Sequence, residues 1–415
     1  MSGSIAVPKP LFDTLENISS TPDTVFDYLQ TLNISAAISE FKLCLEFLKS
    51  YANSADTFTA YRRETERLLD WAWLVSKKSL KDITRNDIRD YLQFVGSPPK
   101  SWIAIKSVPR FIDENGLRKA NEDWRPFIIR ASKSSRRLGK KIDKSDYQLS
   151  NKSIEAIFSC LSSLFTFLQQ ENYLLINPIN LIRQKKGYIQ RQQVRKVTRK
   201  LSKLQWDYVI TAAQTMASED ILHQRTLFLM SAFFLLGLRI SELAYTPGRL
   251  STMGNFAPDK DGLWWYTTIG KGNKLRDIAV PDELLTALKM YRQSLQLPPL
   301  PSREEQTPLL PKLRGKNGLG SRQIRNIVQT VFDKAILALR QQGKKDEAED
   351  LEIATVHWLR HTAISTDVET RPREHIRDDV GHENPSTMDK YIDIDRVARH
   401  QSAQHKQLKP KLEKT

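Results

Sequence analysis

Cysteine is nearly absent from this sequence of 415 residues, and its scarcity limits what the chain can be. The two cysteines, Cys44 and Cys160, are far apart and form no CxxC pair, which argues against a disulfide framework or a cysteine zinc site and favours a reducing compartment. No apolar run approaches the roughly 18 residues of a membrane span, and the first residues lack the charged start and apolar core of a secretion signal. We therefore expect a soluble, intracellular protein.

Acidic residues are also few relative to basic ones. The chain has 64 Lys and Arg against 48 Asp and Glu, which gives a net charge of +16 and a pI near 9.6. Hydrophobic residues make up 40% of the chain, enough for sizeable cores. A polyanionic partner, most commonly nucleic acid, would explain the charge; a basic protein of unrelated function is the alternative.

Helical periodicity dominates the first half of the chain. Apolar residues recur at helical spacing in segments 41–48, 57–75, 85–94 and 153–171, and Thr84 is the predicted N-cap of the third. Residues 97–149 interrupt this pattern with prolines, aromatic residues and a basic second half. We therefore expect an N-terminal arm at 1–34 and a helical domain at 35–184 that contains a basic insertion at about 97–149.

The second half is mostly helical with one small antiparallel sheet. Ser202 is the predicted N-cap of a helix that reaches Thr215, another helix is predicted to start at 238–243, and segments 221–236, 282–295, 321–341 and 355–364 predict further helices. The β-prone segments 264–269 and 275–280 flank a turn rich in Gly and Asn, which predicts a hairpin. We expect a basic linker at 185–200, a second domain at 201–395 and a tail at 396–415. The predicted fold class is mainly α with a small antiparallel sheet (α+β).

Clusters of basic side chains mark candidate contacts with a phosphate backbone. They lie on the second predicted helix, in the insertion, in the linker and beside the hairpin turn, and a solvated loop or a solubilising linker is the alternative interpretation. The candidates are Arg62, Arg63, Arg136, Arg137, Lys140, Lys141, Arg191, Arg195, Lys196, Lys274 and Arg276.

Two further cations stand in positions that suit phosphate chemistry. Arg239 follows a buried helix and a glycine, where Glu242 could pair with it; the pair is either structural or one prong of a phosphate clamp. Lys271 lies in the hairpin turn between Gly270 and Gly272, which let the backbone approach a ligand and project the lysine outward. A lysine in such a turn is more often simply exposed.

The last large block brings together histidine, arginine and tyrosine. His357 and Arg360 share one helix face, His382 follows a glycine, and Tyr391 lies nine residues further on. His357 and His361 have the i, i+4 spacing of a metal pair, but no Glu follows His357 and Arg360 would oppose a metal, so we predict no metal site. Taken singly, His382 and Tyr391 are more often packing residues than catalysts.

In this order, Arg239-x-x-Glu242, Gly270-Lys271-Gly272, His357-x-x-Arg360-His361-Thr362, Gly381-His382 and Tyr391 resemble the tyrosine recombinase (phage integrase) family. The match covers about half the chain, from 201 to 395. Segments 35–95 and 150–178 look like the helical core-binding (SAM-like) DNA-binding domain of that family. The resemblance implies two domains that form a C-shaped clamp on DNA.

The resemblance also implies a mechanism without metal, ATP or cofactor. Tyr391 would attack a scissile phosphate and form a 3′-phosphotyrosyl link, while Arg239 and Arg360 hold the non-bridging oxygens. Lys271 would protonate the leaving 5′ oxygen, His357 would accept the tyrosine proton, and His382 would donate to a phosphate oxygen. Four protomers would act on two duplexes with paired core sites, and the tail after Tyr391 would dock on a neighbour.

Departures from the family pattern concern the subfamily and not the reaction. The arm, the insertion at 97–149, Arg371-Pro372-Arg373, Asp378-Asp379 and residues 386–390 are unusual, and the first two favour a mobile-element integrase of a prokaryotic cytoplasm, associated with the nucleoid. Two alternatives stay open. A type IB topoisomerase uses nearly the same residues without exchanging partners, and a non-catalytic DNA-binding accessory protein could keep the fold.

Overall fold

The computed structural model describes residues 5–129, 142–182, 199–270, 274–312, 314–315 and 317–381, and the structural statements below concern these residues. The chain divides into two compact units, Met1–Gln193 and Val194–Thr415. The division falls within the stretch predicted as a linker, 185–200, of which residues 185–198 lie outside the described part. Each unit is considered by itself.

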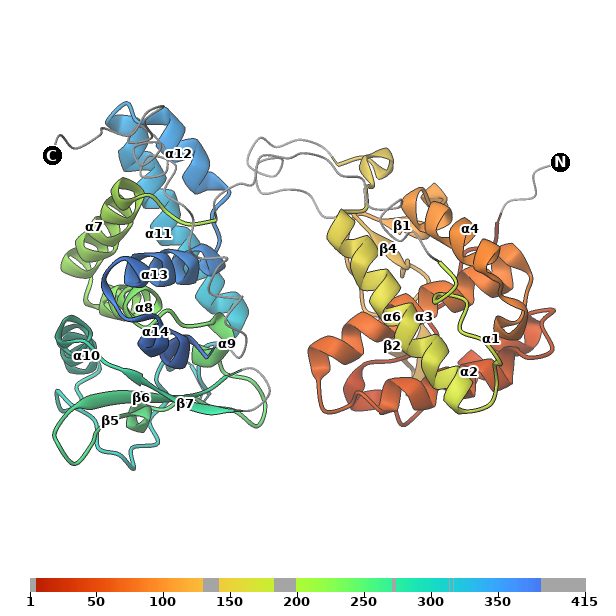
Figure 1. Cartoon of the computed structure of the whole chain (residues 1–415), viewed down its shortest axis with the longest axis horizontal. Coiled ribbons are helices and arrows are strands. Elements are labelled where there is room, and N and C mark those ends of the chain that lie inside the picture. Colours follow the sequence, from red (N-terminus) through yellow and green to blue (C-terminus); the bar gives the residue numbers. More distant parts are fainter. Residues whose placement is uncertain are drawn as a thin grey trace, which may run out of the picture. The chain divides into compact units, whose positions relative to one another are not determined.

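The first unit is built mainly of helices, with two small two-stranded sheets (Figure 1). Its helices are α1 (Asp23–Thr31), α2 (Ala37–Lys49), α3 (Ala55–Trp71), α4 (Arg85–Gly96) and α6 (Asn151–Gln170). Its strands are β1 (Ile103–Ala104), β2 (Phe111–Glu114), β3 (Leu117–Ala120) and β4 (Phe127–Ile128). A π-helical turn, Ala72–Ser76, continues α3, and 3-10 turns cover Leu15–Asn17, Leu80–Asp82, Lys100–Trp102 and Lys144–Asp146.

The four helices predicted for this half are confirmed. Thr84 begins α4 as predicted, in a capping box: its hydroxyl accepts from Asp87 N at 3.4 Å, and the Asp87 carboxylate accepts from Thr84 N at 2.9 Å. Lys78 adds an ion pair to Asp87 at 2.7 Å.

We expected an N-terminal arm at residues 1–34; the described part of this segment, from Ile5 onward, packs on the core of the first unit. Leu11 and Phe12 are 1% exposed, and the Phe12 ring stacks on Phe41 of α2 with centroids 5.1 Å apart. The amide of Leu11 donates to Glu66 Oε1 of α3 at 2.7 Å. The apolar residues of this segment are too few for a core of their own, so they complete the core of the helices.

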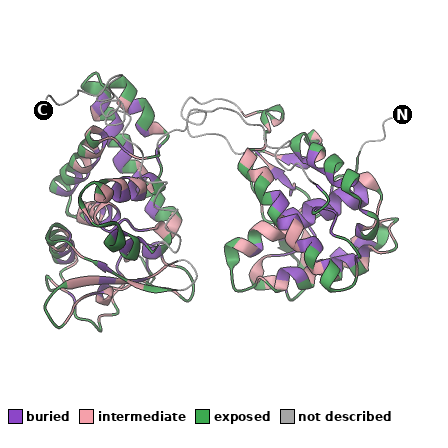
Figure 2. Cartoon of the chain, viewed as in Figure 1, coloured by how far each residue is buried: buried purple, intermediate pink, exposed green. Residues whose placement is uncertain are grey.

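The predicted insertion also belongs to that core. β1 pairs in parallel with β4, so that Ile103 lies opposite Phe127, and β2 forms an antiparallel hairpin with β3. Trp102 and Phe127 are fully buried, and Arg67 of α3 donates twice to Pro126 O, at 2.7 and 2.9 Å. Figure 2 shows the buried residues running through the interior of the unit. These strands were not predicted.

One buried carboxylate ties four parts of the first unit together. Glu40 of α2 is 0% exposed; its Oε1 accepts from Leu80 N at 2.6 Å and from Tyr173 OH at 2.7 Å, and its Oε2 accepts from Trp73 Nε1 at 2.8 Å. Ser79 Oγ is a further donor at 2.5 Å. The donors satisfy both oxygens, which makes burial of the carboxylate tolerable.

The second unit contains the remaining helices and a three-stranded sheet (Figure 1). Its helices are α7 (Lys203–Glu219), α8 (Gln224–Leu235), α9 (Ile240–Leu243), α10 (Asp282–Ser294), α11 (Ser321–Gln341), α12 (Lys345–Glu352), α13 (Val356–Thr370) and α14 (Arg373–Val380). Its strands are β5 (Phe256–Pro258), β6 (Trp264–Ile269) and β7 (Leu275–Ala279), antiparallel in the order β5-β6-β7. Short 3-10 turns cover Ile221–His223 and Met253–Asn255.

The predicted helices and the hairpin of this half are confirmed, and α12, α14 and β5 were missed. Ser202 begins α7 in a capping box with Gln205. β6 and β7 pair in register, with Trp265 opposite Ala279 and Thr267 opposite Asp277. The apolar helix α8 is central: it packs against α7, α10 and α13 and places Phe228, Leu229, Met230 and Phe233 at 0% exposure. Among the described residues, no helix is long and apolar enough to cross a membrane.

Replacing Glu40 with alanine should destabilise the first unit by about 3 kcal/mol, because buried donors on three other segments lose their acceptor. Urea-induced unfolding measures the change. Glu46→Ala is the control: Glu46 lies on the same helix in an exposed ion pair with Lys49 and should cost less than about 0.5 kcal/mol. Equal effects of the two substitutions would contradict the assigned role of Glu40.

Candidate active site

The site begins where α8 ends and α9 begins. Gly237 closes α8 with a φ of +58°, a left-handed conformation that favours glycine, and Arg239 follows in extended conformation as the N-cap of α9. Glu242, 1% exposed, accepts from Arg239 N at 2.7 Å and from Arg239 Nη1 at 3.0 Å. The pair predicted from the sequence is therefore present, and it fixes Arg239 at the start of α9.

A second arginine reaches the same carboxylate from the sheet. Arg276 of β7 donates through Nη2 to Glu242 Oε2 at 2.8 Å and through Nη1 to Val380 O at the end of α14. Its side chain is 9% exposed, and its Nε is buried without a hydrogen-bond partner among the described residues. We expected Arg276 as a DNA contact; the structure instead places it inside the site, because it lies between a buried carboxylate and a helix-terminal carbonyl.

The pKa of Arg276 is lowered, mainly because its side chain is buried. The neighbouring charge of Arg239 lowers this pKa further, whereas Glu242 opposes the shift. Glu242 is therefore the counter-ion for two guanidinium groups. An additional anion near the arginines would be stabilised by the remaining positive charge.

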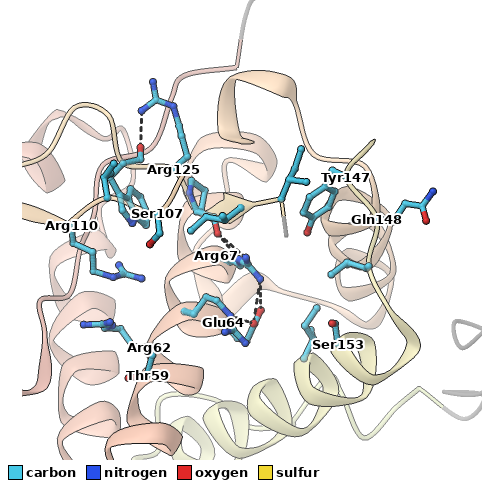
Figure 3. A pocket seen from close by; sticks show the side chains of 18 of the residues that line it. Thr59, Arg62, Glu64, Arg67, Ser107, Arg110, Arg125, Tyr147, Gln148 and Ser153 are labelled. Atoms are coloured by element: carbon cyan, nitrogen blue, oxygen red, sulfur yellow. Dashed lines mark hydrogen bonds and ion pairs between the residues drawn. The ribbon is translucent and has the colours of Figure 1, made fainter. Parts of the chain in front are cut away.

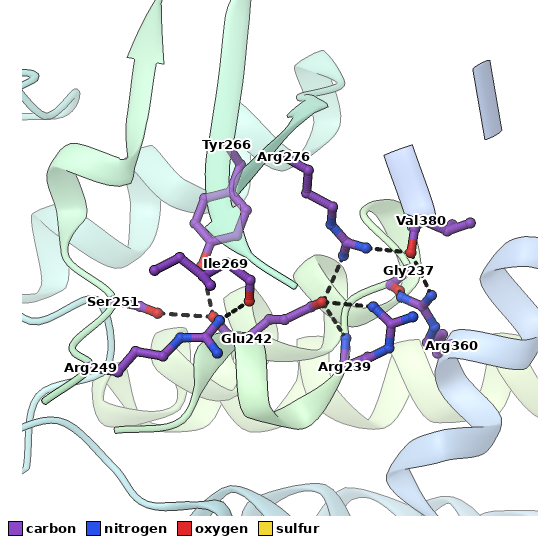
Figure 4. Close-up of polar contacts among 10 residues, drawn as sticks. All are labelled: Gly237, Arg239, Glu242, Arg249, Ser251, Tyr266, Ile269, Arg276, Arg360 and Val380. Carbon is purple, nitrogen blue, oxygen red and sulfur yellow. Dashed lines mark hydrogen bonds and ion pairs between the residues drawn. The ribbon is translucent and has the colours of Figure 1, made fainter. Parts of the chain in front are cut away.

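Arg360 closes the network from α13. It is 1% exposed, and it donates through Nη1 to Gly237 O and through Nη2 to Val380 O at 2.8 Å. Figure 4 shows the continuous path of polar contacts from Arg239 through Glu242 and Arg276 to Val380, and on to Arg360 and Gly237. The structure thus brings together three of the sequence-predicted site residues, Arg239, Glu242 and Arg360, and adds Arg276.

The two arginines expected to clamp a phosphate differ in their exposure. Arg239 leaves 28% of its side chain exposed while one terminal nitrogen binds Glu242. Arg360 is covered, and each of its terminal nitrogens contacts a main-chain carbonyl. In this arrangement Arg239 is the arginine open to a ligand, and Arg360 fixes the relative positions of the ends of α8 and α14.

The end of α14 favours a glycine for two reasons. Gly381 has a φ of +64°, and a Cβ at this position would lie 2.7 Å from Arg276 Nη1. The unusual residues before it also have a structural role: Arg371, between α13 and α14, bonds Asp367 at 3.1 Å and also pairs with Asp379. These contacts brace the turn that directs Val380 toward the arginines.

The remaining candidates divide between described and undescribed residues. His357 is exposed on α13, and its ring lies edge-on to that of His361 at 4.5 Å between centroids. Lys274 is exposed, and its carbonyl accepts from Gly270 N at 2.8 Å across the hairpin turn. No three metal-binding side chains cluster within the described ranges. The candidates outside these ranges are Lys271, His382, Tyr391, Arg136, Arg137, Lys140, Lys141, Arg191, Arg195 and Lys196.

Two expected DNA contacts, Arg62 and Arg63, lie on α3 of the first unit. Arg63 pairs with Glu64 at 2.6 Å, and Arg62 donates to the carbonyl of Asp13. They line a cavity of that unit and are not part of the network around Glu242.

The chain resembles known proteins in sequence and in fold. No protein-family model matches the chain. The chain is 29% identical over 245 residues to Tyrosine recombinase XerC from Thermodesulfovibrio yellowstonii, an alignment that covers 57% of this chain and 69% of that protein. It shares its fold with the XerH site-specific recombinase in a post-cleavage complex with palindromic difH substrate, at a TM-score of 0.52 and 15% identity, over 98% of this chain and 99% of the other.

A second solved structure, the Tn1549 transposon integrase in complex with a circular intermediate DNA, matches at a TM-score of 0.50 and 14% identity, over 87% of this chain and 98% of the other. The sequence relative and the shared fold support the tyrosine recombinase and integrase family for this chain. The predicted fold class is confirmed, since helices predominate and the sheets are small.

Gly381→Ala should cost about 2 kcal/mol of unfolding free energy, because the methyl group adds backbone strain and displaces the Arg276 guanidinium from Val380 O. Gly343→Ala is a matched control: Gly343 also follows a helix with positive φ, but a Cβ there meets nothing within 4 Å, so backbone strain alone, about 1 kcal/mol, is expected. Urea-induced unfolding of both variants checks the difference. Equal costs would show that the approach of Arg276 to Gly381 is unimportant.

Proposed function

We propose that this protein is a site-specific DNA recombinase that cuts and rejoins strands through a 3′-phosphotyrosyl intermediate. The observation that carries the proposal is the buried network in which Glu242 orders Arg239 and Arg276, while Arg360 shares Val380 O with Arg276. These residues come from four separate elements, and their fold is that of the XerH recombinase. These contacts support the proposal because they bring Arg239 and Arg360, the two arginines that the resemblance assigns to a scissile phosphate, into one network.

The reaction proposed for Tyr391, His357 and Lys271 needs no metal or ATP. The Tyr391 oxygen attacks phosphorus, its proton passes to His357, and the P–O bond to the 5′ oxygen breaks as Lys271 gives that oxygen a proton. The bond energy is kept in the phosphotyrosyl ester. Attack by the 5′-hydroxyl of another strand reverses the steps and joins a new partner.

Arginine supplies the electrostatic part of the mechanism. A tyrosine with a pKa near 10 is a poor nucleophile at neutral pH, so the charge that develops on the phosphate oxygens needs fixed donors. Arg239 offers its exposed side to one phosphate oxygen, and His382 donates to another. Arg360 holds the carbonyls of Gly237 and Val380 in place. The bonds of Glu242 hold Arg239 in position before DNA binds, which lowers the reorganisation needed in the transition state.

Assembly on DNA is the second part of the proposal. The first unit would be the core-binding domain, and the two units would close around a duplex as a C-shaped clamp. Four protomers would join two duplexes with paired core sites, and the tail at 396–415 would dock on a neighbour. The relatives support DNA as the partner, since XerH is bound to difH and the Tn1549 integrase to a circular intermediate DNA. The latter is consistent with integration or excision of a mobile element.

Tyr391→Phe should abolish covalent attachment to DNA while leaving DNA affinity within about twofold, because only the nucleophilic oxygen is lost. Nicked suicide duplexes from the ends of the genetic element that carries the gene are the substrates, and a denaturant-resistant protein–DNA band is the signal. A band that survives in the variant would refute the nucleophile. Binding without a band from any duplex would favour a non-catalytic accessory protein, and relaxation of any plasmid by a monomer would favour a type IB topoisomerase.

Arg276→Gln should slow strand cleavage by about 100-fold with little change in DNA affinity, because the loss misplaces Arg239 and Val380 without removing a group that touches the phosphate. Single-turnover cleavage and a binding titration separate the two effects. Arg325→Gln, which removes an exposed arginine from α11, is the control and should leave the cleavage rate unchanged. A drop in DNA affinity equal to the drop in rate would make Arg276 a DNA contact instead.

A further inference from the structure

The first unit contains a large cavity that the proposed reaction does not use. Its volume is about 1070 Å³, at the upper end of ligand pockets. Five arginines line it against two carboxylates, and hydroxyl and amide groups complete the wall (Figure 3). The charged lining residues are Arg62, Arg63, Arg67, Arg110, Arg125, Glu64 and Asp146.

Most of these arginines have carboxylate partners, and two do not. Arg63 and Arg67 pair with Glu64, and Arg110 pairs with Glu66. Arg62 and Arg125 bond only main-chain carbonyls within the described residues: Arg62 bonds that of Asp13, and Arg125 bonds those of Glu122 and Trp124. Arg63 and Arg67 share the single carboxylate of Glu64, and Arg62 and Arg125 are the lining arginines without an ion-pair partner among the described residues.

Arg62 is the lining arginine that keeps an unsatisfied buried donor. Its Nε is buried and has no hydrogen-bond partner among the described residues. Figure 3 shows its guanidinium beside that of Arg110, with Thr59 and Ser107 on the same side of the cavity. Burial lowers the pKa of Arg62 to about 10, and the positive charge of Arg110 contributes, although Glu66, Asp13 and Glu16 oppose the shift. An unsatisfied donor and a like charge nearby are both relieved by one bound anion.

We propose that this cavity binds a phosphate group between Arg62 and Arg110, with Ser107 and Thr59 as further hydrogen-bond donors. The planar forks of two guanidinium groups match the oxygens of a phosphate, whereas a monovalent halide would leave most of their N–H groups unpaired. The site lies in the first unit, in part on the segment 97–149, and is separate from the network around Glu242. The phosphate is that of a free small molecule; a contact of Arg62 with a DNA backbone, which the proposed function would itself place on this unit, is the result that overturns the proposal.

In the first arm, full-length protein is titrated with inorganic pyrophosphate by calorimetry. Wild type and Lys119→Gln should bind with one site per chain, and Arg62→Gln should bind at least about tenfold more weakly, the loss of one charge-assisted contact. Lys119 is the matched control because it is an exposed cation of the same unit, paired with Glu114 outside the cavity. This result assigns the site to a free phosphate compound.

In the second arm, a short labelled duplex is titrated at several salt concentrations. If instead Arg62→Gln weakens DNA binding and lowers the salt slope by about one, while Lys119→Gln does neither and pyrophosphate does not bind, Arg62 is a DNA-backbone contact of the proposed function and the small-molecule site is ruled out. If Arg62→Gln and Lys119→Gln behave alike in both arms, the proposal is wrong.

Circular dichroism shows whether Arg62→Gln folds; if it does not, Ser107→Ala, which removes a proposed donor of the same site from an exposed position, replaces it in both arms. Both arms measure binding and not strand cleavage, so their outcome is independent of the role of Tyr391.

Discussion

The carboxylate of Glu242 is the contact on which the candidate active site depends. Its side chain is buried and accepts three hydrogen bonds, two from Arg239 and one from Arg276. Its main-chain carbonyl accepts two more, from Ser251 Oγ at 2.9 Å and from Tyr266 OH at 3.2 Å. One residue therefore joins the start of α9 to β6, β7 and the loop before the sheet. Without it two guanidinium groups would be left in a low-dielectric site with no counter-ion.

The charge balance of the network suits a phosphate that gains negative charge. The network contains three arginines and one carboxylate, so it carries excess positive charge. The main-chain carbonyls of Gly237 and Val380 hold the guanidinium groups in place but do not neutralise their charge. Asp379 lies near Arg276 but is paired with Arg371. The fold thus keeps a positive, rigid site in the absence of substrate, which is the condition for electrostatic stabilisation of a transition state. A Cβ at Gly381 would meet the Arg276 guanidinium of this network.

The elements that depend on residues close together in the sequence were predicted from short sequence patterns. Thr84 and Ser202 were identified as caps because a capping box spans only four residues, and the β6–β7 hairpin was recognised by the Gly and Asn of its turn. The Arg239–Glu242 pair was predicted for the same reason, since its members are three residues apart. Helix α14 was missed because its eight residues include five charged ones and only two buried apolar side chains, Ile376 and Val380, so it shows no clear stripe.

Contacts between residues that are far apart in the chain could not be predicted from the sequence. Arg276 looked like another surface cation beside a turn, and only folding brings it to a carbonyl 104 residues away. Likewise, Phe12 and Trp102 lie in segments that read as an arm and an insertion, but they are buried because distant helices expose a matching apolar surface. The resemblance in catalytic motifs predicted the family; it gave no sign of Arg276 as a positioning residue or of the arginine-lined cavity.

The most direct measurement identifies the atom that carries DNA. Wild-type protein would be trapped on a suicide duplex, digested with protease and nuclease, and the peptide that retains a nucleotide would be sequenced by tandem mass spectrometry. The account predicts a single adduct, on Tyr391, joined to a 3′-phosphate. A nucleotide on any other residue, or a 5′-phosphate linkage, would contradict it.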